Sequence, residues 1–395
     1  MVLAALAAVS MQIATVRAEN APGVSATEIK MGQTMPYSGP LSAYAVIGKA
    51  ELAYFQMIND AGGVNGRKLS LESRDDAFNP AKTVEQTRKL VEEDGVAFIF
   101  GALGTPTNAA TRGYLNDHQI PQLFLATGAD QFGDPAHFPW TMHFNPSYRT
   151  EGQIYAKYIL REKPEAKVGI LYQHDDFGRD YLRGMKDGFG DSYGKRVVHE
   201  ESYETTDPTV DAQVIALQGS GADVFLIAAT ARAAAQAIRK AYDVGWRPLR
   251  LLNLNSTSIA AVLQPAGLDK AAGILVAGAY KDATNPQWAG DADVVAWDKY
   301  MDKYLPGADK ADGSYFYGYS VAQAMVQVLK QCGDDLSRDN IMKQAANLRE
   351  FHAAILLPGI TMNTSATNYH PIRQMQLGRF DGKAWQNFGG IIAAQ

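Results

Sequence analysis

The chain has 395 residues, with 37 Lys and Arg against 42 Asp and Glu, so its formal charge is −5. A content of 46% hydrophobic and 20% charged residues is ordinary for a soluble globular protein, and the length suggests two or three domains. No block of Lys and Arg occurs, which argues against a nucleic-acid partner because phosphate binding needs a clustered basic face. The single cysteine, Cys332, excludes an internal disulfide and any CxxC-type metal or redox site.

The N-terminal segment is an apolar, alanine-rich run without charge before Arg17. The run is too short and too weakly apolar for a membrane span, which needs about 20 strongly apolar residues. Val16 and Ala18 are small or modest residues at the positions that a signal peptidase reads, so we expect residues 1–18 to form a signal peptide, although the usual positive N-terminal region is missing. A disordered or helical tail is the alternative. No cysteine follows the run, which argues against a lipid anchor.

From residue 28 onward, short apolar runs alternate with amphipathic helical runs. Asn79-Pro80 has the pattern of a helix start, and Gly62-Gly63 that of a helix end. Apolar runs between turn residues are typical of parallel strands buried on both faces, and the alternation predicts a doubly wound α/β fold. We expect strands at 29–35, 68–74, 96–100, 120–125, 167–172, 222–227, 249–254 and 272–278, helices at 48–63, 80–93, 106–116, 147–162, 178–189, 208–218 and 231–243, and a closing hairpin at 374–388.

The alternation breaks in three places, at 130–145, 253–258 and 358–371. Three breaks predict two doubly wound parallel-sheet lobes joined by three crossing strands, a hinge that limits relative motion to bending around a ligand. We expect the crossings near 143–145, 253–255 and 358–360, lobe 1 at 27–142 and 256–357, and lobe 2 at 146–252 and 361–395.

Catalytic motifs are missing from the sequence, which has no GxSxG, GxxxxGK[ST] or GxGxxG pattern. The seven histidines never fall at HxxxH or HExxH spacing, so no zinc site can be identified. The adjacent acids Asp75-Asp76 and Asp175-Asp176 fit loop and helix-entry roles, because neighbouring side chains point to different faces. We therefore expect neither an enzyme, nor a cofactor, nor a metal site.

The segment Gly101-Ala-Leu-Gly-Thr105-Pro106 follows a predicted strand and begins a predicted helix. In open α/β sheets, ligands bind beyond the carboxyl ends of the strands, where loops lead into helix N-termini. Free N–H groups around Gly104 and Thr105, together with the helix dipole, predict an anion site to which Thr105 adds its hydroxyl. Capping of the helix is an alternative or additional role for Thr105.

The next strand ends in Ala126-Thr-Gly-Ala129, which should lie beside this anion site. Gly128 would let the backbone approach a ligand closely, and Thr127 or Asp130 would supply a polar side chain. An ordinary turn at the end of a strand is the alternative interpretation.

Several short motifs also occur in a characteristic order. Together they resemble the type I periplasmic solute-binding proteins of the Leu/Ile/Val-binding branch of ABC importers, over roughly residues 27–390. ATGA, FPWTM and Tyr148 make the chain most similar to members that take up aromatic or other organic acids. The motifs are MPYSGP (35–40), NGRK (65–68), DD (75–76) with Pro80, GALGT (101–105), ATGA (126–129), Tyr172 with DDFG (175–178), and YDVG (242–245).

This resemblance implies a periplasmic protein, expected to be a monomer, that traps a small carboxylate ligand and delivers it to ABC permease subunits in the inner membrane. It also implies that Tyr44 and Phe177 present aromatic rings to the ligand, with Tyr315 as a third candidate; core packing is the alternative for each ring. Thr230 and Arg232 follow a predicted strand at a helix start. Arg232 either pairs with a carboxylate or is a solvated surface residue.

Asn255 marks a departure from the amino-acid binders of this branch, which place a carboxylate there to hold the ligand ammonium. An ammonium group buried without a counter-charge is unfavourable, so we expect an aromatic acid of the benzoate or cinnamate type. Two alternatives remain: a protein that binds branched-chain or other amino acids, with Asp130 as the ammonium partner, and a ligand-sensing module of a signalling receptor.

Overall fold

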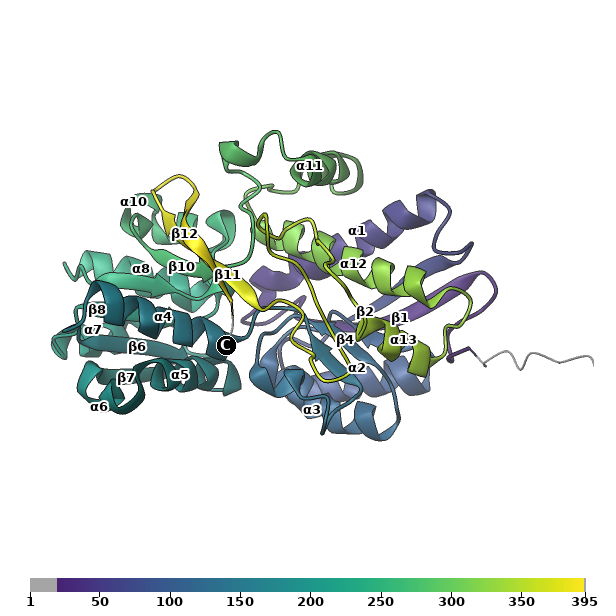
Figure 1. Cartoon of the computed structure of the whole chain (residues 1–395), viewed down its shortest axis with the longest axis horizontal. Helices are drawn as coiled ribbons and strands as arrows, with labels where there is room; N and C mark the ends of the chain where they lie inside the picture. The colour runs from purple at the N-terminus through teal and green to yellow at the C-terminus, as the bar shows by residue number, and fades with distance from the viewer. Residues whose placement is uncertain (1–19, 394–395) are drawn as a thin grey trace, which may run out of the picture.

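The computed structural model describes residues 20–393 and contains two α/β lobes, each built on its own sheet (Figure 1). The predicted signal peptide lies outside the described residues. Within them, the first sheet has five strands in the order β2-β1-β3-β4-β5, and every adjacent pair is parallel. These strands are β1 (Glu28–Met35), β2 (Lys68–Asp75), β3 (Phe98–Phe100), β4 (Gln122–Leu125) and β5 (Thr141–His143).

Helices cover both faces of the first sheet, as the alternating pattern predicts. Asn79 caps α2 by accepting hydrogen bonds from the N–H groups of Ala81 and Lys82, and Pro80 occupies the first turn. The helices of this lobe are α1 (Ala45–Asp60), α2 (Pro80–Glu92), α3 (Thr105–Asp117), α11 (Ala292–Tyr304), α12 (Gly313–Cys332) and α13 (Arg338–Ala345).

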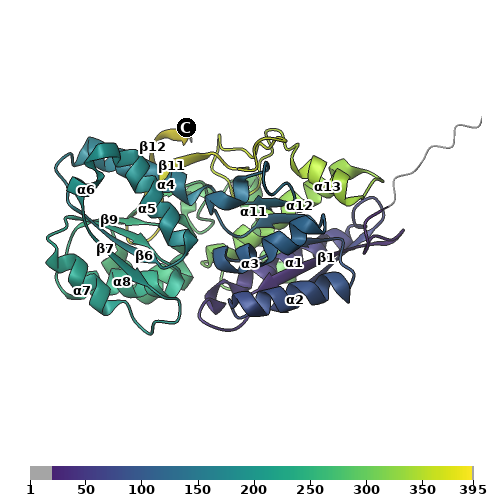
Figure 2. The same cartoon turned by 90° about the horizontal axis from the view of Figure 1, so that it is seen from below.

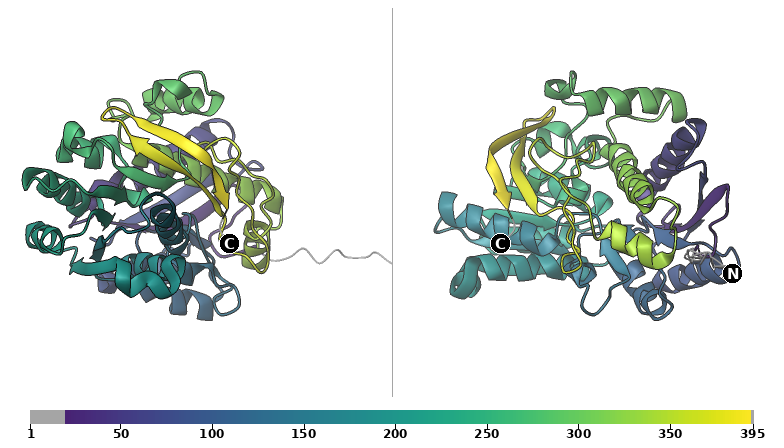
Figure 3. Two further views of the ribbon diagram at one scale, coloured as in Figure 1. Left: turned by 60° about the vertical axis from the view of Figure 1, so that its left-hand side comes forward. Right: turned by 45° about the vertical axis from the view of Figure 1, so that its right-hand side comes forward.

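The second sheet has seven strands in the described part of the chain, in the order β12-β11-β10-β9-β8-β6-β7. The pairs from β10 to β7 are parallel, whereas β11 and β12 form the predicted antiparallel hairpin along one edge (Figure 3). The strands are β6 (Val168–Gln173), β7 (Val197–Tyr203), β8 (Val224–Ala228), β9 (Leu249–Leu252), β10 (Leu275–Gly278), β11 (Gln374–Phe380) and β12 (Trp385–Ala393).

Helices α4 and α5 pack on one face of this second sheet, and α7 and α8 on the other (Figure 2). The fold is therefore the expected one of two doubly wound lobes. The remaining helices are short. In chain order, the helices of this lobe are α4 (Tyr148–Glu162), α5 (Asp176–Phe189), α6 (Tyr193–Arg196), α7 (Asp211–Gly219), α8 (Ala231–Asp243), α9 (Gln264–Ala266) and α10 (Leu268–Ala271).

Two of the chain crossings lie elsewhere than the sequence pattern suggested. The strand β10 pairs with β9 and β11, so the chain passes to the first lobe after Gly278 rather than near 253–255. There Tyr280 pairs with Leu356, and the two segments run antiparallel between the lobes. The third passage also comes later than 358–360, because Met362 and Ile372 belong to the core of the first lobe. The second lobe therefore continues past the expected end at 252 to Gly278, and the first lobe continues past the expected end at 357 to Ile372.

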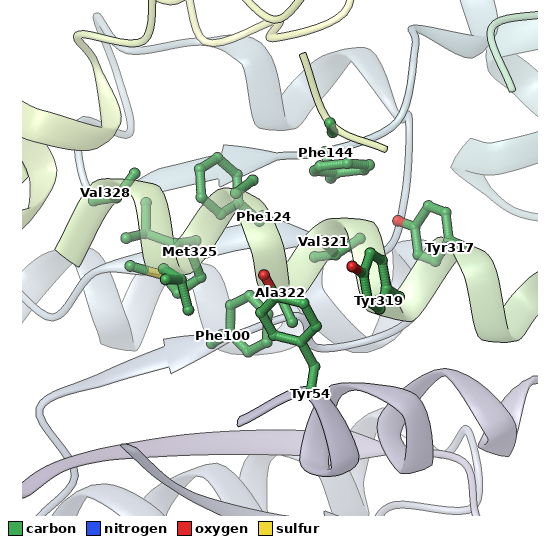
Figure 4. Close-up of a cluster of buried hydrophobic side chains, with 14 of the residues drawn as sticks. Tyr54, Phe100, Phe124, Phe144, Tyr317, Tyr319, Val321, Ala322, Met325 and Val328 are labelled. Carbon is green, nitrogen blue, oxygen red and sulfur yellow. The ribbon is translucent and has the colours of Figure 1, made fainter. Parts of the chain in front are cut away.

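The core of the first lobe is built around α12, whose apolar residues are buried over most of its length. Figure 4 shows its residues Val321 and Met325 facing Phe100 and Phe124 from the strands of the sheet. Phe144, at the end of β5, meets Tyr317 of the same helix edge-on, with 5.5 Å between ring centroids. This packing fixes one wall of the space between the lobes. No helix among the described residues is long and apolar enough to cross a membrane.

Candidate functional site

A cavity of about 150 Å³ lies between the two lobes, at the carboxyl ends of the parallel strands. Loops that follow β3, β4, β6, β8, β9 and β10 contribute to its walls, which is where an open α/β sheet binds ligands. The structure brings six of the residues proposed from the sequence together around this cavity: Tyr44, Gly104, Thr105, Phe177, Thr230 and Asn255.

The N-terminus of α3 reaches this cavity without a side-chain cap. Gly104 turns the chain into the helix with φ of 106°, a conformation that favours glycine. Thr105 does not cap the helix; its hydroxyl oxygen lies 2.8 Å from that of Thr127, and both side chains are buried. The uncapped N–H groups and the two hydroxyls form a site suited to an anion.

Two of the other helices that start at the cavity, α5 and α8, have N–H groups of the first turn occupied. Asp175 caps α5 by accepting hydrogen bonds from the N–H groups of Phe177 and Gly178, and burial raises the pKa of Asp175 to about 6. At the start of α8, the Ala231 N–H donates to the hydroxyl of Tyr44, 3.0 Å away, from the opposite lobe. Among α3, α5 and α8, the N-terminus of α3 is therefore the uncapped one.

Asn255 takes part in a polar network that connects the second lobe to two crossing segments. Its amide donates to the hydroxyl of Tyr148 at 2.7 Å, and its carbonyl oxygen accepts from Asn145 at 3.0 Å. Tyr280 donates in turn to Asn145 at 3.3 Å. Burial raises the pKa of Tyr148 to about 12, so its hydroxyl remains protonated at neutral pH. The position after β9 thus carries a neutral amide bound to neutral partners.

Aromatic and aliphatic side chains supply most of the remaining wall. Tyr148 and Phe177 meet edge-on, with 4.9 Å between ring centroids. Several residues of this wall were not identified from the sequence, although many of them follow strand ends: Asn145, Tyr148, Gln173, Tyr280, Asp282, Tyr317 and Trp385.

Thr127 and Gly128 lie behind the cavity wall rather than on it. The Thr127 hydroxyl is occupied by Thr105 and by the N–H of Ala129, 3.2 Å away. A side chain at Gly128 would collide with the carbonyl of Pro146 and the ring of Tyr148, so close packing of the protein itself explains this glycine. Both residues support Thr105 and Tyr148, which line the cavity.

Asp130 and Arg232 do not line the cavity either. Asp130 lines a separate surface depression. Ser147 donates a 2.5 Å hydrogen bond to the Asp130 carboxylate, and the Arg149 guanidinium lies 3.7 Å from the same carboxylate. The Arg232 guanidinium donates to the backbone carbonyls of Thr205 and Asp207 on the exposed side of α8. Asp130 is therefore not placed to hold a ligand ammonium in this cavity, and Arg232 is not placed to bind a carboxylate there.

Tyr315 packs against the core of the first lobe, whereas Tyr317 lines the cavity. Both belong to α12, and residues two apart on a helix point in nearly opposite directions. The structure therefore places Tyr317, rather than Tyr315, at the cavity.

Among residues 20–393, no group of His, Cys, Asp and Glu side chains is arranged to hold a metal ion. The single cysteine is buried, and burial raises the pKa of the Cys332 thiol to about 12. Cys332 does not line the cavity.

Comparison with known proteins identifies the family. Residues 28–384 match the family model described as periplasmic binding protein. A Leu/Ile/Val-binding protein homologue of Brucella abortus is 25% identical over 252 residues, and the match spans 61% of this chain and 61% of that protein. A second homologue, from Brucella melitensis, is 26% identical over 67% of this chain and 71% of its own length.

Solved structures show the same fold at low sequence identity. A branched-chain amino acid ABC transporter protein from Thermus thermophilus, with bound valine, superposes with a TM-score of 0.84 at 17% identity, over 94% of this chain and 98% of that chain. A fatty acid ABC transporter substrate-binding protein from Thermomonospora curvata gives 0.78 at 20% identity, over 95% of each chain. The family is one of binding proteins, which agrees with the expectation that the chain is not an enzyme. The chain belongs to the periplasmic binding protein family.

Proposed function

We propose that this protein binds a small carboxylic acid between its two lobes, in the periplasm, and delivers it to the permease of an ABC importer. The observation that carries the proposal is the cavity between the lobes, at the uncapped N-terminus of α3. Family membership and the relatives' names support the transport role. The valine-bound neighbour and the fatty acid ABC transporter neighbour both have this fold, so the fold by itself does not determine the ligand.

The ligand carboxylate is assigned to the N-terminus of α3. Helix N–H groups and the dipole favour an anion there, and Thr105 adds a hydroxyl donor. The rings of Tyr44, Tyr148 and Phe177 would then surround an apolar body.

An aromatic acid is favoured over an α-amino acid, because Asn255 and its partners are neutral. Among the described residues that line the cavity between β9 and β10, none is acidic, so none there pairs an α-ammonium group. An amino-acid ligand is the alternative, because the neighbour solved with bound valine has the same fold.

Calorimetry with benzoate, cinnamate, leucine, isoleucine and valine in one buffer tests the proposed ligand class. We expect micromolar or tighter binding of an aromatic acid and little response to the three amino acids. Thr105→Ala should weaken binding by about tenfold or more, as expected for loss of a hydrogen bond to a charged group, whereas Thr105→Ser keeps the hydroxyl and most of the affinity. Tight leucine binding without a response to aromatic acids would instead favour the amino-acid alternative.

A further inference from the structure

An unpartnered buried carboxylate oxygen lies on the side of the cavity formed by the segment that crosses to the first lobe after β10. Asp282, four residues after β10, is the acidic residue that lines the cavity in the described part of the chain. Its Oδ1 atom accepts hydrogen bonds from the N–H and hydroxyl of Thr284, at 3.0 and 2.7 Å. Its Oδ2 atom is buried, and no described residue donates a hydrogen bond to it.

A second unpartnered oxygen belongs to a residue that lines the same cavity. The Tyr317 side chain is 8% exposed, and its hydroxyl has no hydrogen-bond partner among residues 20–393. Tyr317 packs edge-on against Tyr280 of the same crossing segment, with 5.9 Å between ring centroids. Buried polar groups without partners are rare, because each loses its bonds to water, so two of them on one cavity call for a partner from outside the chain.

The neighbouring cation does not supply that partner. Lys281 is almost fully buried, and its ammonium lies 3.0 Å from Asp291 and 3.4 Å from Asp293 at the start of α11. Its charge is therefore used by α11, and Asp282 presents a carboxylate oxygen that no described cation neutralises.

We infer that Asp282 and Tyr317 form a polar subsite of the cavity, which binds a hydroxyl group on the body of the ligand. The inference rests on the proposed function and narrows it to hydroxylated aromatic acids. A phenolic hydroxyl that donates to Asp282 Oδ2, or that accepts from the Tyr317 hydroxyl, gives a buried oxygen the partner it lacks.

Calorimetry on the full-length protein tests the subsite with cinnamate and 4-hydroxycinnamate. The wild type should bind the hydroxylated acid about tenfold more tightly or better, as expected for a hydrogen bond to a charged group. Asp282→Asn keeps the Oδ1 acceptor for Thr284 and should reduce this preference severalfold, as should Tyr317→Phe, while affinity for cinnamate changes little. Asp298→Asn, an exposed acid on α11, is the matched control and should keep the full preference.

The outcomes distinguish this inference from the proposed function. If cinnamate binds but the added hydroxyl brings no gain, or if Asp282→Asn and Tyr317→Phe keep the gain, the subsite is wrong and the proposed function stands. If no aromatic acid binds, the proposed aromatic class is wrong. Hexanoate and 6-hydroxyhexanoate then test the subsite separately: a preference for the hydroxy acid that depends on Asp282 supports it, and its absence overturns it.

Discussion

Glu151 of α4 is a buried carboxyl that holds one edge of the candidate site in place. It accepts hydrogen bonds from the hydroxyls of Tyr155 and Tyr181, at 2.7 and 2.6 Å, and from the N–H of Leu254 at 2.9 Å. Leu254 lines the cavity next to Asn255, so Glu151 positions the loop that follows β9. Burial raises the pKa of Glu151 to about 8.

The raised pKa predicts a pH-dependent contribution to stability. The folded protein keeps a proton on Glu151 that the unfolded chain loses near pH 4.3, the usual value for glutamate. The contribution is therefore complete below about pH 4.3 and is lost as the pH rises through about 8. Glu151→Gln does not titrate, so the free energy of unfolding of the wild type should fall relative to this variant between about pH 5 and 8, by up to about 1.4 kcal/mol per pH unit.

Urea unfolding of both proteins at several pH values measures this difference. The comparison cancels the titration of other buried acids, such as Asp180, whose pKa is raised to about 6 by burial. Parallel stability curves for wild type and variant would show that Glu151 is ionised in both the folded and the unfolded states over this range.

At the scale of elements, the connection between β3 and α3 depends on one backbone conformation. Gly104 has φ of 106°, and a Cβ atom there would meet the ring of Phe78 and the hydroxyl of Thr107. Gly113, on the same helix, has no atom near the position of an added Cβ. The two glycines of this segment therefore differ in physical role.

Alanine substitutions should separate these roles. Gly104→Ala forces a residue with a side chain into the left-handed region, and we expect a loss of about 1–3 kcal/mol in the free energy of unfolding, with weaker ligand binding. Gly113→Ala should stabilise by about 0.5–1 kcal/mol, because alanine favours the helix. Urea unfolding gives both values. Equal stability of the two variants would mean that the turn adapts to a side chain.

At the scale of the whole molecule, Tyr44 links the two lobes across the cavity. Its hydroxyl donates to the carbonyl of Asn255 at 3.2 Å and accepts from the N–H of Ala231 at 3.0 Å. Tyr44 precedes α1 in the first lobe, and both partners belong to the second. Because the lobes are joined by crossing segments that can bend, these bonds favour the closed arrangement.

We expect Tyr44→Phe to open the unliganded protein, because each lost hydrogen bond is worth about 0.5–1.5 kcal/mol. Small-angle scattering should show a larger radius of gyration for this variant, and a saturating ligand should restore the smaller value. Tyr37→Phe removes a hydroxyl that bonds to Ser73 within the first lobe, so its radius should match the wild type. An identical radius for all three unliganded proteins would contradict the proposed link.

Much of the fold was predictable because its signals are local. The apolar runs and helical periodicity predicted the strands of both sheets, except the short β5 and the polar β7, and the Asn79-Pro80 start of α2 and the Asp-Gly hairpin lie where expected. The loop from Gly101 to Thr105 was identifiable for the same reason, since a strand end followed by a helix start is visible in consecutive residues.

Only the tertiary structure decided which residues face the cavity and which lobe each strand joins. The four buried residues of β10 would fit either sheet, and long-range pairing with β11 placed them in the second. Asp130 is held outside the cavity by Ser147 and Arg149 of a later segment, while Asp282 reaches it from a crossing segment that the local pattern did not reveal. Local sequence specifies secondary structure through short-range sterics and periodicity, whereas a site depends on contacts between residues far apart in the chain, and these are set by packing.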